Sequence, residues 1–190
     1  MKKLQIWLTV AGLAALTVAA GAQTMGSPER YTAMAVNMNR GGAGSVEIVV
    51  NRWSTDADRD KLMSTLLDKG ADKLLSVLQD MPRVGYFRTP SSLGYDLHYA
   101  RKNPLPEGGE RVVLATDRRI GVWEAANQPR SIDYPFTIIE LRLNKDGEGE
   151  GKISLATKII PDKNSNTVVL ENYEAQPVLL QSVKRERASQ

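Results

Sequence analysis

Short segments of alternating apolar and polar residues, joined by turn-rich links, constrain the fold of this chain more than any other feature. Such alternation is typical of half-buried strands, because successive side chains of a strand point to opposite faces. We expect strands over residues 31–39, 45–53, 84–89, 95–102, 111–117, 136–143, 152–160, 167–173 and 178–183. Most of the links are short and rich in glycine, proline and asparagine, which favours antiparallel pairing, since a parallel pair needs a long crossover.

The pattern changes to a helical period in one place only. Ser54 and Thr55, followed by two aspartates, are typical of a helix N-terminus, and leucines then recur at helical spacing. A second short helix is expected over residues 72–79, before Pro82. We therefore predict a mainly β fold with an inserted helical hairpin: an antiparallel barrel or sandwich of about nine strands, with the helices covering one end or an edge.

The first 22 residues have the pattern of a cleavable signal peptide. Lys2 and Lys3 precede an uncharged apolar run, and Ala20-Gly21-Ala22 supplies the small residues of a cleavage site. We expect a periplasmic or secreted protein with no membrane span after cleavage. Residues 23–183 are expected to form a single β-rich domain, and residues 184–190 a flexible polar tail.

Composition narrows the range of partners and cofactors. The chain has no cysteine, so its stability must come from packing and not from disulfides. The formal net charge of +3 falls to +1 once Lys2 and Lys3 leave with the signal peptide, which gives no electrostatic reason to expect nucleic acid. No cofactor and no metal site are expected, because the single histidine and the absence of cysteine exclude the common ligand clusters.

The only histidine, His98, lies in a strand pattern that places Asp96 on the same face and Tyr95, Leu97 and Tyr99 on the other. A carboxylate beside an imidazole is a general-base arrangement, so both residues are catalytic candidates. No nucleophile or second ligand is adjacent in the sequence, and a solvated histidine without a chemical role is the alternative interpretation.

The segment 117–136 joins two expected strands and gathers aromatic, basic and acidic side chains. Long connections often carry binding residues because a rigid sheet positions them. The ligand-binding candidates are Arg118, Trp123, Arg130 and Tyr134, and the further catalytic candidates are Glu124 and Asp133. The alternative is that this segment only covers one end of the barrel, with Trp123 as a plug.

Three motifs resemble a group of uncharacterised secreted bacterial proteins without assigned activity. They are Arg52-Trp53-Ser54-Thr55, then Pro82-Arg83-Val84-Gly85-Tyr86 with Arg88-Thr89-Pro90, and Trp123-Glu124-Ala125 with Asp133-Tyr134-Pro135-Phe136. The resemblance extends over nearly all of the chain after residue 22. It implies export and a bacterial origin, and it supplies no catalytic or binding residues.

Three functions remain open at this point. The leading hypothesis is a non-enzymatic binding domain, for either an apolar small molecule inside a barrel or an envelope protein on its surface. The alternative is a carboxylate-dependent hydrolase of the cell envelope, which needs no local sequence motif. A structural envelope protein is the third possibility, and a broad exposed apolar patch would indicate it.

Overall fold

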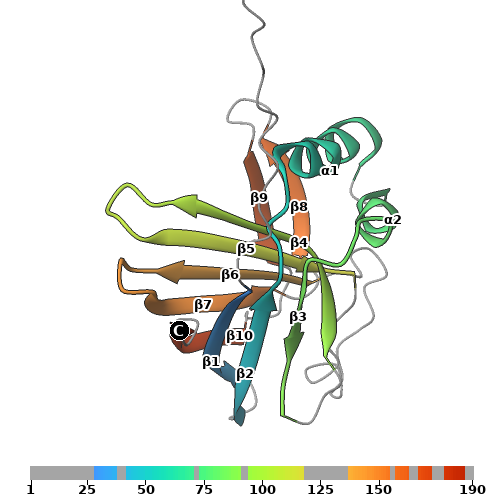
Figure 1. Ribbon diagram of the computed structural model, residues 1–190. Helices are drawn as coiled ribbons and strands as arrows, with labels where there is room; N and C mark the ends of the chain where they lie inside the picture. The colour runs from blue at the N-terminus through green and yellow to red at the C-terminus, as the bar shows by residue number, and fades with distance from the viewer. Residues whose placement is uncertain are drawn as a thin grey trace, which may run out of the picture.

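The computed structural model describes residues 28–37, 42–70, 73–90, 94–117, 137–154, 157–162, 167–172 and 178–186 (Figure 1). The strands are β1 (Glu29–Asn37), β2 (Gly42–Val50), β3 (Gly85–Arg88), β4 (Tyr95–Pro104), β5 (Glu110–Thr116), β6 (Thr137–Leu143), β7 (Glu148–Ser154), β8 (Thr157–Asp162), β9 (Thr167–Asn172) and β10 (Val178–Glu186). The helices are α1 (Asp56–Lys69) and α2 (Leu74–Gln79). None of the helices in these ranges is both long and apolar enough to span a bilayer.

Eight of these strands close into an antiparallel barrel in the order β1-β10-β7-β6-β5-β4-β3-β2. The first strand completes the ring, since β1 pairs with β2 on one side and with β10 on the other. The predicted mainly β fold with an inserted helical hairpin is confirmed, and of the two architectures left open by the sequence the structure has the barrel. Closure pairs the backbone groups that an open sheet would leave exposed along its edges.

The barrel interior is filled by the inward-facing side chains of its strands. The largest fully buried side chains there are Tyr31, Ile48, Val50, Phe87, Leu97, Leu114, Ile139, Leu141, Leu143, Ile153 and Leu180. They come from all eight barrel strands and follow the alternation that the sequence predicts. An eight-stranded barrel is just wide enough for side chains to fill it, and this one is packed in that way.

Glycines in β7 allow it to approach β6 closely. A Cβ atom at Gly149 would lie 1.9 Å from the carbonyl oxygen of Arg142, and one at Gly151 would lie 2.5 Å from that of Glu140. Heavy atoms cannot approach so closely, so only glycine fits these two positions without a shift of the backbone. The alternating glycines of the sequence therefore serve strand packing.

A β-bulge in β4 changes which side chains face the barrel interior. The register with β5 shifts between Leu97 and Tyr99, so that Leu97 and Ala100 are both buried inside. Tyr99 instead packs outside the barrel against the helices. The expectation that Tyr99 shares a face with Leu97 is therefore wrong, because the extra residue of a bulge inverts the alternation beyond it.

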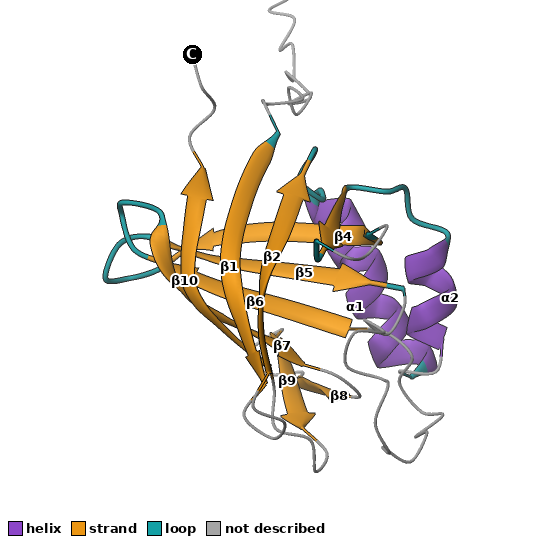
Figure 2. Cartoon of the chain, turned by 90° about the horizontal axis from the view of Figure 1, so that it is seen from below, coloured by secondary structure: helices purple, strands orange, loops and turns teal. Residues whose placement is uncertain are grey.

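The two helices pack against the outer face of β4, β5 and β6, close to the point where β5 ends and β6 begins (Figure 2). Thr55 caps α1: its hydroxyl accepts a hydrogen bond from the backbone N–H of Asp58, whose carboxylate accepts one from the N–H of Thr55. The buried contact with β4, β5 and β6 is made by Leu66, Leu74, Leu78 and Met81 with Tyr99, Ala115 and Ile138. A closed barrel has no sheet edge to cover, which explains this position.

Two features near the C-terminus differ from the sequence-based expectation. The single strand expected over 152–160 is two strands, because β7 belongs to the barrel whereas β8 pairs with β9 in a separate two-stranded sheet. The last strand continues to Glu186, beyond its expected end at Val183, because Lys184 pairs with β7 and β1 pairs with residues 184–186. Residues 184–186 therefore belong to the barrel, and residues 187–190 lie outside the described ranges.

Candidate functional site

Only two of the eight candidate residues lie in the part of the chain that the structure describes. Asp96 and His98 are on β4, whereas the other six are in the connection between β5 and β6 and fall outside the described residues. Those six are Arg118, Trp123, Glu124, Arg130, Asp133 and Tyr134. The described part of the predicted site is therefore β4 and its surroundings.

Asp96 does not contact His98 but forms an ion pair with Arg83. The distance from Arg83 Nε to Asp96 Oδ1 is 2.8 Å, and both side chains are about half exposed. The Arg83 guanidinium also lies 5.6 Å from the centre of the Tyr86 ring, within range of a cation–π contact. Asp96 is thus part of a solvent-facing surface pair.

His98 is held by a different carboxylate, that of Asp117. Its Nδ1 lies 2.8 Å from the carbonyl oxygen of Met81, and its Nε2 lies 3.7 Å from Asp117 Oδ1. A carbonyl oxygen only accepts hydrogen bonds, so Nδ1 carries a proton and the ring orientation is fixed. His98 and Asp117 are largely buried, and they join the segment before β3 to the end of β5. No group of three or more potential metal-ligating side chains is found in the described residues.

Polar side chains converge where one end of the barrel opens, and sequence reasoning missed them. We call them the mouth cluster: Glu29, Tyr31, Trp53, Lys102, Glu110 and Arg185. Glu29 and Tyr31 begin β1, Lys102 is near the end of β4, Glu110 begins β5 and Arg185 is near the end of β10. Antiparallel strands bring these ends together.

Hydrogen bonds join the members of the mouth cluster in two neighbouring groups. The Tyr31 hydroxyl donates to Glu29 Oε2 at 2.8 Å, and Trp53 Nε1 and Lys102 Nζ approach Glu29 Oε1. The Lys102 ammonium also lies 4.7 Å from the centre of the Trp53 ring. Beside them, Arg185 Nη1 donates to Glu110 Oε1 at 2.7 Å. The two acids are matched by two cations, so the mouth is closed by neutralised charges.

The surroundings of Tyr31 raise its pKa and those of Glu29 lower its pKa, so both values move further from neutral pH. Burial, reinforced by the Glu29 carboxylate, raises the pKa of Tyr31 far above its ordinary value. Burial alone would raise the pKa of Glu29, but hydrogen bonds from Lys102 and Tyr31 outweigh it and leave the pKa below its ordinary value. Tyr31 therefore stays protonated and Glu29 ionised near neutral pH. A proton-transfer role needs a pKa near the working pH, which neither residue has.

One hollow of about 560 Å³ lies between the tips of the β4–β5 and β6–β7 hairpins, and two others are on the outer wall. One, of about 470 Å³, lies over β1, β2 and β3 and includes Arg30, Glu47 and Arg88. Glu47 is only 14% exposed and pairs directly with both arginines, each of which is about half exposed. The cations of this hollow are therefore already bound to an internal carboxylate.

A second hollow, of about 450 Å³, lies over β6, β7 and β10. Its lining includes Glu140 and two cations, Arg142 and Lys152, and Arg111 of β5 also approaches Glu140. The nearest nitrogens are 3.4 Å from Glu140 for Lys152 and 3.9 Å for both arginines. These distances exceed the roughly 2.8 Å of a direct charged hydrogen bond, so the cations here are only loosely paired.

In comparisons with known proteins, no protein-family model, curated protein or solved structure matches this chain.

Proposed function

We propose that this chain is an exported, non-enzymatic binding domain that contacts another protein of the cell envelope through the outer wall of its barrel. Export follows from the signal-peptide pattern of residues 1–22. The observation that carries the rest is the filled interior of the barrel, which favours a partner on the surface over a ligand inside.

The interior offers an apolar ligand little space. Inward-facing residues from opposite parts of the barrel, such as Tyr31, Phe87, Leu114 and Leu141, are all fully buried. Barrels that carry small molecules leave an interior volume for the ligand, and their mouths stay passable. Here the ion pairs of the mouth cluster occupy one end, so entry would require breaking hydrogen bonds between charged groups.

The chemistry of the described residues also supports binding over catalysis. Asp96 and His98, the two candidates that the structure describes, contact different partners and do not form an acid–base pair. Glu29 and Tyr31 have their pKa values moved away from neutrality, in opposite directions. The outer wall, in contrast, presents hollows lined by arginine, which is enriched at protein interfaces.

Native mass spectrometry separates a carrier from a protein-binding domain. The protein, produced in its native host and isolated from the envelope fraction, is weighed under native and denaturing conditions. We expect the bare polypeptide mass and a complex with a second polypeptide. A small additional mass that is lost on denaturation would refute the proposal, because it would identify a ligand held inside the barrel.

Photocrosslinking then locates the contact on the outer wall. A benzoylphenylalanine placed at Val113 of β5 or at Ser45 of β2 faces outward on opposite parts of the barrel. We expect a single protein to be captured from one of these positions and not from the other. Equal capture of many proteins from both positions would show nonspecific contact and would count against a binding domain.

A further inference from the structure

We propose that the outer wall around Glu140 binds a carboxylate-bearing, acidic peptide segment of the protein partner. The cations that would hold it are Arg111, Arg142 and Lys152, and we call them the cation triad. This inference rests on the proposed function and names the chemistry of the surface that the partner recognises.

The strand register places two positive charges directly opposite each other. Arg111 of β5 pairs with Arg142 of β6, and both side chains are about half exposed. Like charges at directly opposed positions destabilise a sheet. Lys152 of β7 is opposite Glu140, so a third cation adjoins the same carboxylate. Residues at a binding site commonly reduce the stability of the fold, because they are placed for the ligand and not for the packing of the protein.

Glu140 is too distant to satisfy the triad. Its side chain is 18% exposed, and it lies 3.4 to 3.9 Å from the three cationic nitrogens, without a direct hydrogen bond to any of them. Each arginine carries five N–H donors. On the described wall, therefore, most donors of Arg111 and Arg142 remain available for an incoming acceptor.

The charge of this surface favours an anionic occupant. Three cations surround the carboxylate of Glu140, and Glu150 of β7 adds a second negative charge. Glu150 is opposite Arg142, but the two side chains form no ion pair among the described residues. The excess is thus one positive charge, which one carboxylate of a ligand would neutralise. Guanidinium groups match the planar, two-oxygen geometry of carboxylates better than that of any uncharged acceptor.

The adjacent hollow favours a peptide over an inorganic ion. Its volume of about 450 Å³ exceeds that of a single small anion, and Leu179 and Gln181 of β10 contribute apolar and amide surface beside the cations. A segment with carboxylates and an aliphatic side chain would use both kinds of surface. The hollow over β1 to β3 offers a matched comparison, because its two arginines are already bound to Glu47.

The test uses the protein without residues 1–22 and a fluorescein-labelled Glu-Leu-Glu-Glu peptide, in anisotropy titrations at about 20 mM salt, where screening is weak. We expect the double variant Arg111→Gln/Arg142→Gln to weaken binding about tenfold or more. The matched double variant Arg30→Gln/Arg88→Gln makes the same charge change on the hollow over β1 to β3. Its affinity for the peptide should stay within about twofold of the wild-type affinity. Thermal melts confirm that both variants fold.

A further variant tests the role of Glu140 directly. Glu140→Gln removes the internal carboxylate that competes for the triad, so peptide binding should tighten about threefold. Equal weakening in the two double variants, or no binding by the folded wild-type protein, would overturn the inference. So would competition by inorganic phosphate at the same concentration as unlabelled peptide, because it would indicate a general anion site. If these tests fail while crosslinking still captures one protein, the proposed function stands and only this surface assignment is lost.

Discussion

The hydroxyl of Tyr31 offers the sharpest test of how the barrel mouth is held closed. Tyr31→Phe keeps the buried ring but removes the 2.8 Å hydrogen bond from the Tyr31 hydroxyl to Glu29 Oε2. A hydrogen bond to a charged group contributes about 1.5–3 kcal/mol. Glu29 keeps Lys102 and Trp53 as partners, so we expect a loss of about 1–2 kcal/mol, around the lower end of that range. For a domain of this size the corresponding fall in Tm is about 2–8 °C.

Tyr99→Phe is the matched control for this experiment. Tyr99 is partly buried and its pKa is raised by burial, but no hydrogen bond of its hydroxyl is found among the described residues. Its substitution should change the free energy of unfolding, measured by urea denaturation at pH 7, by less than about 0.5 kcal/mol. Equal losses in Tyr31→Phe and Tyr99→Phe would refute the reasoning, because the hydrogen bond to Glu29 would then contribute nothing of its own.

The pH dependence of the Glu29 contribution follows from the direction of its pKa shift. The pKa of Glu29 is lower in the folded state than its ordinary value of 4.5, which applies to the unfolded chain. Its carboxylate therefore stabilises the fold fully above pH 4.5, and the contribution is lost as pH falls through the lower folded pKa. We expect the stability difference between wild type and Glu29→Gln to be constant from pH 6 to 8 and to shrink below pH 4.5. A difference that grows on acidification would contradict the assignment.

Four further substitutions test the packing, the strand approach and the helix cap. Leu141→Ala, at a fully buried core position, should lower the free energy of unfolding by about 2–5 kcal/mol in urea titrations. Gly149→Ala should destabilise the barrel by more than about 2 kcal/mol, because its Cβ would meet the backbone of β6, whereas Gly44→Ala, with no atom within 4 Å, should be tolerated. Thr55→Ala removes the cap of α1 and should cost about 0.5–2 kcal/mol by the same assay.

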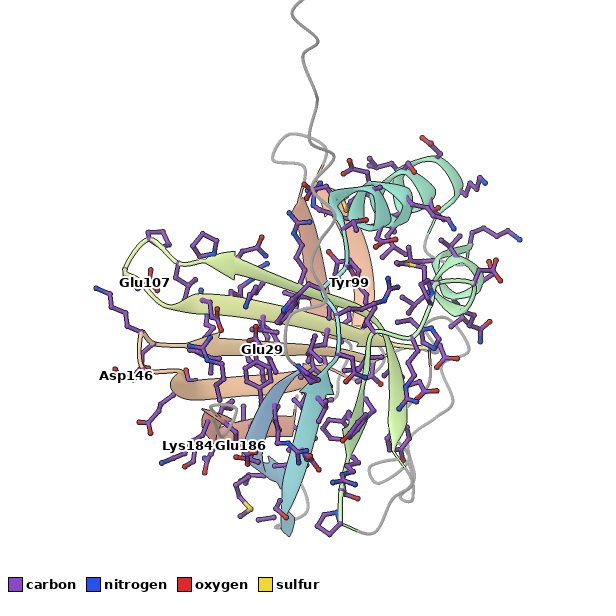
Figure 3. All side chains as sticks on the ribbon, viewed as in Figure 1. Glu29, Tyr99, Glu107, Asp146, Lys184 and Glu186 are labelled. Carbon is purple, nitrogen blue, oxygen red and sulfur yellow. The ribbon has the colours of Figure 1, made fainter. Side chains whose placement is uncertain are left out.

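The alternation of the sequence predicts most of the barrel wall, because the apolar and polar residues within each strand indicate which side chains face the interior and which face solvent. In β6, for example, Ile139, Leu141 and Leu143 are buried while Glu140 and Arg142 between them face solvent, as a period of two requires. The turn-rich links likewise locate the hairpins, and Figure 3 shows Glu107 and Asp146 at the tips of the β4–β5 and β6–β7 hairpins. Local pattern and local structure agree wherever a strand is regular.

The structure differs from the prediction where the register or the end of a strand is determined by pairing with another strand. The bulge in β4 sends Tyr99 to the helices, and nothing in the residues before or after it marks the extra residue. The positive φ of 51° at Ser182 in β10 accompanies a similar register shift there. The extension of β10 is also nonlocal, since the polar residues 184–186 resemble a solvated tail until β1 is known to lie beside them.

The mouth cluster was beyond sequence reasoning for the same reason. Its members are far apart in the chain, with Glu29 and Lys102 separated by 73 residues and Glu110 and Arg185 by 75. A charged residue at the end of an alternating strand normally indicates that the strand leaves the core. Only the closed ring shows that these four strand ends meet, and that their charges then pair.

Two similar groups of charges on the outer wall differ in how closely the carboxylate holds its cations. Glu47 is directly opposite Arg88 and diagonal to Arg30, so both guanidinium groups reach it. At the second group Glu140 is likewise directly opposite a cation, Lys152, and diagonal to Arg111. Its nearest cationic nitrogens are nevertheless 3.4 to 3.9 Å away. The pairing register is thus similar in the two groups, and the difference is that Glu140 is shared among three cations without a direct hydrogen bond to any of them. The wall around Glu140 is therefore where an acidic partner would gain most, because its carboxylates would form contacts that the protein itself does not provide.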